Sequence, residues 1–114
     1  MIPKVKRIKD PEAIEAVRKP YSEISGKPTY GAPCHHVITV GSGGPDHPFN
    51  LIQTTGNEHI DCHNGKYSKD YLFSIIAERE GYTVGFIKHE INRMRLEGGR
   101  VLYGQGSTMQ TLWP

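Results

Sequence analysis

The stretch Gly31–His63, GAPCHHVITVGSGGPDHPFNLIQTTGNEHIDCH, contains five of the six histidines of the chain. His35 and His36 are adjacent, and neighbouring side chains on a β-strand point to opposite faces. His59 and His63 are four residues apart, and residues at this spacing lie on one face of a helix. The pattern therefore predicts two different tasks for the first pair of histidines and one shared target for the second pair.

The local patterns of this stretch predict a β-hairpin followed by a short helix. HHVITV (35–40) is rich in β-branched residues and favours a strand, and FNLIQT (49–54) could pair back with it as a second strand. GSGGPDHP between them is expected to form a loop. NEHIDCH (57–63) predicts a helix that stops near Asn64-Gly65. The strand would place His36, Ile38 and Val40 on one face and His35, Val37 and Thr39 on the other.

Helices are expected on both sides of the hairpin. Asp10 as N-cap and Pro11 at the first helical position predict a helix over about 11–19, ended by Pro20. Residues 21–33 are dense in Ser, Gly and Pro and predict turns. Two further helices are predicted within about 69–97, the second stopping at Gly98-Gly99. Their predicted core stripes are Tyr71, Leu72, Ile75 and Ile76, and then Val84, Ile87, Ile91 and Met94.

Length and composition limit the class of protein. A chain of 114 residues predicts a single domain with one modest core. Its net charge of +2 is too small to indicate nucleic-acid binding by itself. Two cysteines, no signal peptide and no long apolar stretch predict a soluble cytoplasmic protein without a membrane segment. The clusters Lys4, Lys6, Arg7, Lys9 and Arg93, Arg95, Arg100 are expected at the solvated surface more often than in a binding face.

Three motifs occur in a fixed order within the histidine-rich stretch. The doublet His35-His36 is followed fourteen residues later by Asn50, and His59 and His63 follow Asn50 by nine and thirteen residues. Each motif alone is weak, but their combination resembles the HNH endonucleases, the ββα-metal group that includes the colicin-type DNases. The resemblance covers residues 21 to about 65. It implies an α+β domain over 1–114, with a ββα-metal centre wrapped by additional helices.

The resemblance also implies a role for each motif residue. His35 would be a ligand of one divalent metal ion, and His59 and His63 would be the remaining ligands. His36 would be the general base, and Asn50 would orient its ring through a hydrogen bond. A neutral imidazole can accept a proton near neutral pH if the ring is held in the right tautomer. Mg²⁺ or Mn²⁺ is favoured by the habit of the family, although three imidazoles would also suit Zn²⁺, Ni²⁺ or Co²⁺.

One feature of many family members is missing from this chain. They carry two Cys-x2-Cys knuckles that hold a structural zinc ion. Here the four corresponding positions are occupied by Ser22, Ser25, Thr55 and Glu58. Hydroxyl groups are poor zinc ligands, so no structural zinc is expected, and the two serines could instead cap a turn.

Other polar residues near the motifs have open assignments. Cys34 and Cys62 are expected to be inert thiols rather than metal ligands. The carboxylates of Asp46, Glu58 and Asp61 are expected to be solvated. Lys66, Lys69, Arg93 and Arg95 could contact DNA phosphates or be solvated.

The resemblance implies a metal-dependent endonuclease that cuts DNA and leaves a 3′-hydroxyl and a 5′-phosphate. One site would nick one strand, and the absence of a recognisable base-reading motif predicts low sequence specificity. One alternative is a non-catalytic nucleic-acid-binding module with a structural metal site. Another is a metallohydrolase that acts on a different substrate. Both a monomer and a homodimer stay open.

Overall fold

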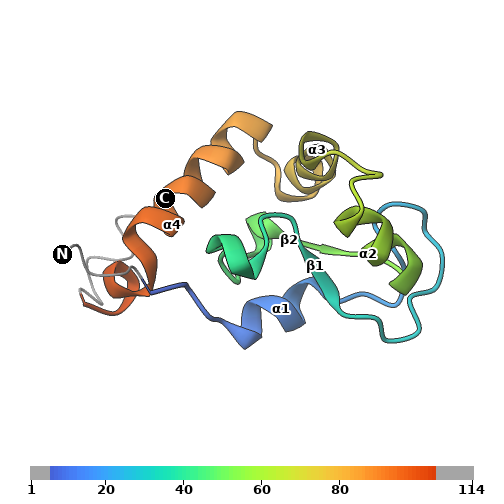
Figure 1. Cartoon of the computed structure of the whole chain (residues 1–114), viewed down its shortest axis with the longest axis horizontal. Helices are drawn as coiled ribbons and strands as arrows, with labels where there is room; N and C mark the ends of the chain where they lie inside the picture. The colour runs from blue at the N-terminus through green and yellow to red at the C-terminus, as the bar shows by residue number, and fades with distance from the viewer. Residues whose placement is uncertain (1–5, 105–114) are drawn as a thin grey trace.

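The computed structural model describes residues 6–104, with side chains as far as residue 98. Helices and a two-stranded antiparallel sheet form this part of the chain (Figure 1), so the expected α+β class is confirmed. Lys4 and the side chain of Arg100, both expected at the surface, lie outside the described part. The elements are α1 (Pro11–Val17), β1 (Cys34–His36), the 3-10 turns η1 (Val40–Ser42) and η2 (Pro48–Asn50), β2 (Leu51–Gln53), α2 (Gly56–His63), α3 (Lys69–Glu80) and α4 (Val84–Gly104).

The predicted hairpin is present, but its strands are shorter than expected. The predicted strand over 35–40 is wrong beyond His36, because the side chain of Asn50 takes up the backbone hydrogen-bonding groups of Ile38. The Val37 N–H donates to the Asn50 carbonyl oxygen at 2.9 Å, and the Ile38 N–H donates to Asn50 Oδ1 at 2.7 Å. The chain then turns into η1, so the alternation of faces does not continue. The register places Cys34 opposite Gln53, His35 opposite Ile52 and His36 opposite Leu51.

α1 covers one side of the hairpin (Figure 1). Asp10 is the N-cap, as predicted: its Oδ1 accepts from the Glu12 N–H at 3.1 Å and from the Ala13 N–H at 3.3 Å. The helix ends two residues before the predicted 19, because Arg18 already has an extended ψ of 137°. Helices usually end at or before the residue that precedes a proline, which here is Lys19. A small core lies under this helix, formed by Ala13, Val17, Cys34 and Leu51.

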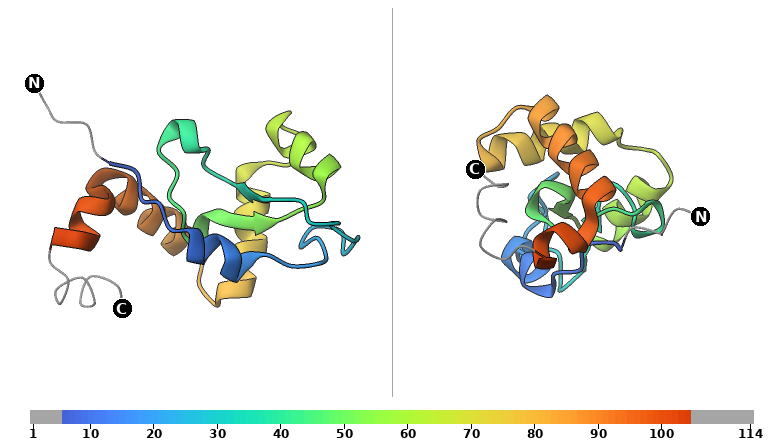
Figure 2. Two further views of the ribbon diagram at one scale, coloured as in Figure 1. Left: turned by 90° about the horizontal axis from the view of Figure 1, so that it is seen from below. Right: turned by 90° about the vertical axis from the view of Figure 1, so that its left-hand side faces the viewer.

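α3 and α4 cover the other side, as Figure 2 shows from two further directions. Leu72 and Ile76 in α3 are buried, as their spacing predicts, whereas Tyr71 is 44% exposed. In α4 the predicted stripe is also confirmed, with Ile87 and Ile91 almost fully buried. The main core consists of Ile8, Val37, Phe49, Ile52, Leu72, Phe73, Ile76, Ala77, Ile87, Ile91 and Met94.

α4 is the longest helix of the described part, and its course tests the predicted stop at Gly98-Gly99. Gly98 has φ 64° and ψ −168°, which breaks the helix at the predicted position. Helical backbone then resumes as far as Gly104. Across residues 6–104, no helix combines the length and the apolar character that a membrane span requires.

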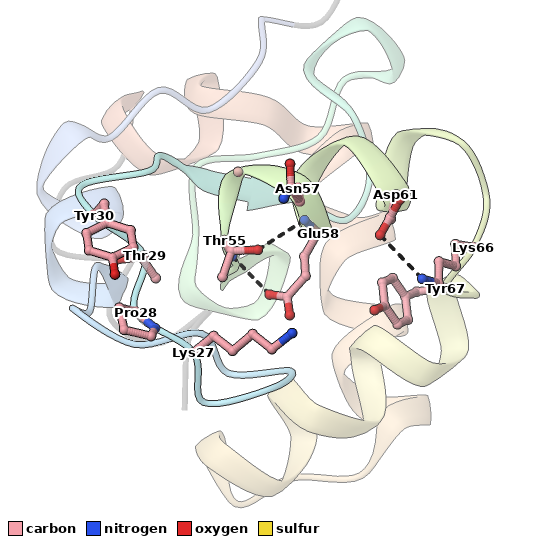
Figure 3. Close-up of a pocket in the computed structure, with 11 residues that line it drawn as sticks. Lys27, Pro28, Thr29, Tyr30, Thr55, Asn57, Glu58, Asp61, Lys66 and Tyr67 are labelled. Atoms are coloured by element: carbon pink, nitrogen blue, oxygen red, sulfur yellow. Dashed lines mark hydrogen bonds and ion pairs between the residues drawn. The ribbon is translucent and has the colours of Figure 1, made fainter.

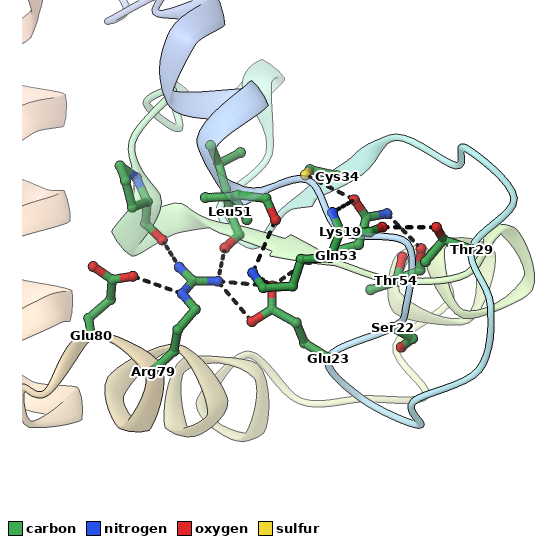
Figure 4. Close-up of polar contacts among 12 residues, drawn as sticks. Lys19, Ser22, Glu23, Thr29, Cys34, Leu51, Gln53, Thr54, Arg79 and Glu80 are labelled. Atoms are coloured by element: carbon green, nitrogen blue, oxygen red, sulfur yellow. Dashed lines mark hydrogen bonds and ion pairs between the residues drawn. The ribbon is translucent and has the colours of Figure 1, made fainter.

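Arg79 of α3 fastens this helix to the hairpin (Figure 4). Its guanidinium donates to both carboxylate oxygens of Glu23 at 3.0 Å and to the Leu51 carbonyl oxygen at 3.1 Å. It also donates to the Pro48 carbonyl oxygen and, through Nε, to the Glu80 carboxylate. One side chain therefore joins α3, η2, β2 and the turn region before β1.

Gln53 holds the same turn region from the strand side (Figure 4). Its N–H donates to Glu23 Oε1 at 3.0 Å, and its Nε2 donates to the Ala32 carbonyl oxygen at 2.9 Å. Its Oε1 accepts from the Lys19 N–H at 3.1 Å. Residues 19–32 are thus fixed to β2 by hydrogen bonds from both ends.

Candidate metal centre

α2 presents two histidines on one face. The helix begins at a capping box in which Thr55 Oγ1 accepts from the Glu58 N–H at 3.1 Å and Glu58 Oε1 accepts from the Thr55 N–H at 3.0 Å. Gly65, with φ 80°, follows its C-terminal end. The rings of His59 and His63 stack with their centroids 4.9 Å apart and their planes 17° apart. The i, i+4 spacing therefore produces the shared face that the sequence predicts.

β1 brings a third histidine to this face. The ring of His35 meets those of His59 and His63 edge-on, with centroid distances of 5.0 Å to each. One ligand nitrogen from each ring can be chosen so that all three lie within 4.8 Å of one another. The structure thus brings together the three residues that the resemblance implies as metal ligands. His36 lies on the opposite face of the strand, since neighbouring residues alternate.

Burial favours the neutral forms of His35 and His59, which are the forms that can bind a metal ion. His35 is 4% exposed, and its Nδ1 is buried without a hydrogen-bond partner among the described residues. Burial, followed by the nearby charges of His59, His63, His36 and Lys69, lowers the pKa of His35 to about 4. Burial and the neighbouring histidines also lower the pKa of His59. Neutral rings keep a lone pair available to an ion, and an orphaned buried nitrogen is otherwise costly.

The donor set fits a single divalent ion. Three imidazole nitrogens would leave further coordination positions open, as in catalytic metal sites. Within the described residues, the cluster includes neither a carboxylate nor a thiol. Imidazole donors suit Zn²⁺, Ni²⁺ and Co²⁺, whereas Mg²⁺ prefers oxygen ligands. The identity of the ion stays a prediction.

His36 has a carboxylate partner that the sequence analysis did not identify. Its Nε2 lies 2.8 Å from Oδ1 of Asp46, which is 6% exposed. The same oxygen accepts from Arg7 Nη1 at 2.7 Å, and Oδ2 accepts from the Asp10 N–H at 2.9 Å. The expectation that Asp46 is solvated is therefore wrong, and Arg7 is not a free surface charge.

Asn50 does not make the predicted contact with the ring of His36. Its Nδ2 donates to the Ile38 carbonyl oxygen at 3.0 Å and to the Pro45 carbonyl oxygen at 3.1 Å, while its Oδ1 accepts from the Ile38 N–H. The whole carboxamide is engaged in shaping the loop between the strands. The loop is tight here: a Cβ on Gly44 would lie 1.8 Å from the Ile38 carbonyl oxygen. Asn50 therefore acts on the loop that follows His36, not on its ring.

Two hollows flank the histidine cluster. A cavity of about 310 Å³ has His36, His59 and His63 in its wall, so the residue predicted as base and two predicted ligands border one space. A second cavity, of about 270 Å³, has His35, His63 and Lys69 in its wall. His63 lines both cavities, so His36 and Lys69 each border a space next to the histidine cluster.

The four basic residues considered for DNA binding differ in their surroundings. Lys69 opens α3 beside the cluster. Lys66 is exposed and forms an ion pair with Asp61 at 3.5 Å, so Asp61 lies at the surface as expected. Arg93 is engaged in ion pairs with Glu90 and Glu97 on its own helix. Arg95 donates through Nε to the Ser42 carbonyl oxygen and so contacts η1.

Both cysteines are free thiols outside the histidine cluster. Cys34 is buried, with Sγ 3.5 Å from Gln53 Oε1, and burial raises the pKa of its thiol. Burial, together with Glu58 and Asp61, raises the pKa of the Cys62 thiol. Both side chains therefore favour the protonated thiol, which is a poor metal ligand and a poor nucleophile.

The four residues at the family's zinc-knuckle positions also converge, but through hydrogen bonds. Ser22 Oγ donates to Glu58 Oε1 at 2.5 Å and accepts from the Ile24 N–H and the Ser25 N–H. Figure 3 shows the other side of Glu58, where it closes the capping box with Thr55 beside a cavity of about 570 Å³. Glu58 is buried, so the expectation that its carboxylate is solvated is wrong. Ser22 caps a turn, as the alternative proposed, and binds Glu58 as well.

The sequence held little signal for the two buried carboxylates. Asp46 lies in a Gly- and Pro-rich loop, and its partner Arg7 is 39 residues away. Glu58 follows Thr55 by three residues, a spacing typical of a capping box, which could have revealed its role.

The comparisons with known proteins cover a small part of the chain. A segment of 33 residues, 29% of the chain, is 48% identical to the "Uncharacterized 38.5 kDa protein in psbA intron 1" of Chlamydomonas moewusii. The chain matches only 10% of the length of that relative. No protein-family model matches the chain. No solved structure matches it either.

Proposed function

We propose that this chain is a divalent-metal-dependent endonuclease of the HNH type that nicks DNA with low sequence specificity. The observation that carries the proposal is the cavity bordered by His36, His59 and His63. It places a possible proton acceptor next to a cluster that can hold a cation. Phosphodiester hydrolysis needs both, because the attacking water must lose a proton while charge grows on the phosphoryl group.

In this proposal, His35, His59 and His63 hold one ion. When bound, it would supply positive charge to the phosphoryl oxygens and the leaving oxygen. Mg²⁺ or Mn²⁺ is proposed as the ion that supports turnover. Zn²⁺, Ni²⁺ and Co²⁺ are the alternatives, because imidazole nitrogens also bind these ions. His36 takes a proton from the attacking water at one ring nitrogen. The water oxygen bonds to phosphorus and the bond to the 3′ oxygen breaks. The leaving 3′ oxygen takes a proton from solvent, and His36 returns its proton to solvent, so the products are a 3′-hydroxyl and a 5′-phosphate.

DNA binding would rest mainly on the backbone of the nucleic acid. Lys69 is the first candidate for a phosphate contact, since it borders a cavity with two of the cluster histidines. Lys66 and Arg95 are further candidates, whereas Arg93 is already paired with two carboxylates. Binding of this kind weakens steeply as the salt concentration rises. A cytoplasmic location, in keeping with two free thiols, is part of the proposal.

The decisive experiment is a nicking assay on supercoiled plasmid. The protein is incubated with each of the five ions in turn and with a chelator, and His36→Ala and His89→Ala are compared with the parent chain. His89 is an exposed histidine of α4 and serves as the matched control. We expect metal-dependent relaxation that His36→Ala reduces by about 10²- to 10⁴-fold and His89→Ala leaves intact.

Metal binding is measured in parallel by titration calorimetry. His36→Ala should bind the ion as tightly as the parent chain, because His36 is not one of the three histidines of the cluster. Supercoils that persist with every ion would contradict the proposal. If the protein then still retained DNA in a metal-dependent way, it would be a binding module with a structural ion. If it retained no DNA, a hydrolase acting on another substrate would become the better hypothesis.

A further inference from the structure

The loop between the two strands contains Asp46, a buried carboxylate that is held by several hydrogen bonds. Asp46 accepts hydrogen bonds from Arg7 Nη1 at 2.7 Å and from the Asp10 N–H at 2.9 Å, and its Oδ1 lies 2.8 Å from Nε2 of His36. Its own N–H donates to the Ile8 carbonyl oxygen at 3.0 Å. Backbone and side chain are thus both anchored, and the carboxylate has little freedom to turn away from His36.

The charge of Asp46 decides which atom of His36 carries the proton. Burial alone would raise the pKa of this carboxyl, but the hydrogen bonds from Arg7, His36 and Asp10 and the charge of Arg7 keep it below its ordinary value. An ionised carboxylate only accepts hydrogen bonds. In a neutral imidazole one nitrogen donates and the other accepts. Contact with Asp46 therefore selects the Nε2–H tautomer and leaves the lone pair on Nδ1.

A purely structural ion pair does not account for this arrangement. Arg7 would satisfy the carboxylate without help from His36, since it shares the same oxygen. The ring of His36 is nevertheless held there while it borders the cavity with His59 and His63. Asn50, the residue that the resemblance implies for this task, is fully engaged with Ile38 and Pro45.

We propose that Asp46 is the positioning residue of His36, holding the Nε2–H tautomer so that Nδ1 is the proton acceptor. The mechanistic part rests on the proposed nuclease function, whereas the tautomer does not. When water attacks, its proton moves to Nδ1 of His36, and Asp46 stabilises the imidazolium without taking up a proton itself. Arg7 and the Asp10 N–H keep the carboxylate in place.

The first test reads the tautomer directly and needs no activity. The ring nitrogens of His36 are observed by ¹⁵N NMR in the metal-free protein at a pH where the imidazole is neutral, with assignment from His36→Gln. We expect the parent chain to show Nε2–H. Asp46→Ala should lose this preference, and Asp46→Glu, which keeps the carboxylate, should restore at least part of it. An Nδ1–H ring in the parent chain, or one unaffected by Asp46→Ala, would overturn the proposal.

The second test separates positioning from substrate binding. Asp46→Asn and Asp46→Glu are compared with Glu15→Gln, which alters an exposed carboxylate of α1. We expect Asp46→Asn to lower kcat for nicking by about 10- to 100-fold with KM for DNA unchanged, partial rescue by Asp46→Glu, and no change in Glu15→Gln. An unchanged kcat in Asp46→Asn, or a loss confined to KM, would contradict the positioning role. If the parent chain does not nick at all, the nuclease proposal fails while the NMR result still stands.

Discussion

Two clusters of polar side chains lie along α2, one around Glu58 and one around His35, and they differ in how their buried polar groups are hydrogen-bonded. At the start of the helix, the Glu58 carboxylate accepts hydrogen bonds from the Ser22 hydroxyl and from the Thr55 N–H. The second of these bonds is part of the capping box, in which Thr55 Oγ1 also accepts from the Glu58 N–H. At the other cluster, a nitrogen of His35 is buried without any partner among the described residues. An unpaired buried polar group costs about 1–3 kcal/mol. The first cluster therefore satisfies its polar groups within the protein, whereas we expect the second to do so by binding a ligand.

The two clusters are therefore expected to respond differently to mutation and to added metal ions. Ser22 is joined to Glu58 and to the turn that follows it by hydrogen bonds between protein atoms alone. The histidines offer three nitrogen donors and border two cavities. We therefore expect changes at Glu58 to affect stability without metal affinity, and changes at His59 or His63 to affect metal affinity first.

The largest expected effect comes from removing a ligand. In the parent chain, Zn²⁺ or another bound ion should stabilise the fold by about 4 kcal/mol when the free ion is 1,000 times Kd. His59→Ala should lose most of this gain, because only two of the three donors remain. Thermal unfolding with and without the ion measures it, and His89→Ala is the control. An equal gain in His59→Ala would show that the ion binds elsewhere.

Acidification of the metal-free protein should give the next largest effect. The unfolded chain protonates histidine near its ordinary pKa of ~6.5, whereas the pKa of His35 in the folded protein is lowered to about 4. Between these values the unfolded state binds more protons, so stability falls as the pH falls and levels off below about 4. The loss attributable to His35 is on the order of 3 kcal/mol.

Urea unfolding in the presence of a chelator, repeated across this pH range, would measure that loss. His35→Gln cannot take up the proton and should flatten the profile. If the variant keeps the full slope of the parent chain, other groups cause the acid sensitivity and the burial of His35 is not its source.

Glu58→Ala should be less damaging and should act on stability alone. It removes the acceptor of the Ser22 hydroxyl and the Thr55 N–H, for an expected loss of about 2 kcal/mol in the free energy of unfolding. Calorimetric metal affinity should stay at the parent value. Glu78→Ala, at an exposed site on α3, should change stability by no more than about 0.5 kcal/mol. Loss of metal binding in Glu58→Ala would mean that the two clusters are not independent.

The smallest effect is expected from Thr55→Ala. This substitution deletes the N-cap hydroxyl that accepts from the Glu58 N–H, for a loss of about 1 kcal/mol. Thr55→Ser keeps the hydroxyl and should stay near the parent value. The midpoints of denaturant unfolding are compared for the parent chain, Thr55→Ala and Thr55→Ser. Equal midpoints would show that the N-cap hydroxyl adds nothing to stability.

Features determined by neighbouring residues could be predicted from the sequence. The N-cap Asp10, the end of α2 before Gly65 and the shared face of His59 and His63 all depend on spacings of a few residues. The convergence of His35 with that pair came from the family resemblance, and the structure reproduces it.

Features determined by distant residues could not be predicted in the same way. The strand beyond His36 fails because the side chain of Asn50, from the far side of the loop, supplies its hydrogen bonds. Asp46 is buried only because Arg7 and the Asp10 N–H arrive from the N-terminal segment. No local pattern of hydrophobicity or turn residues contains that information, since it depends on which segments meet in three dimensions.

The fastening of residues 19–32 by Arg79 and Gln53 has a practical consequence for the whole protein. A fold that depends on a structural metal ion is expected to unfold when the ion is removed. Here the same region is tied down by permanent parts of the polypeptide. We therefore expect the fold to persist when no cation is bound. One preparation of the metal-free protein can then be titrated with each cation in turn.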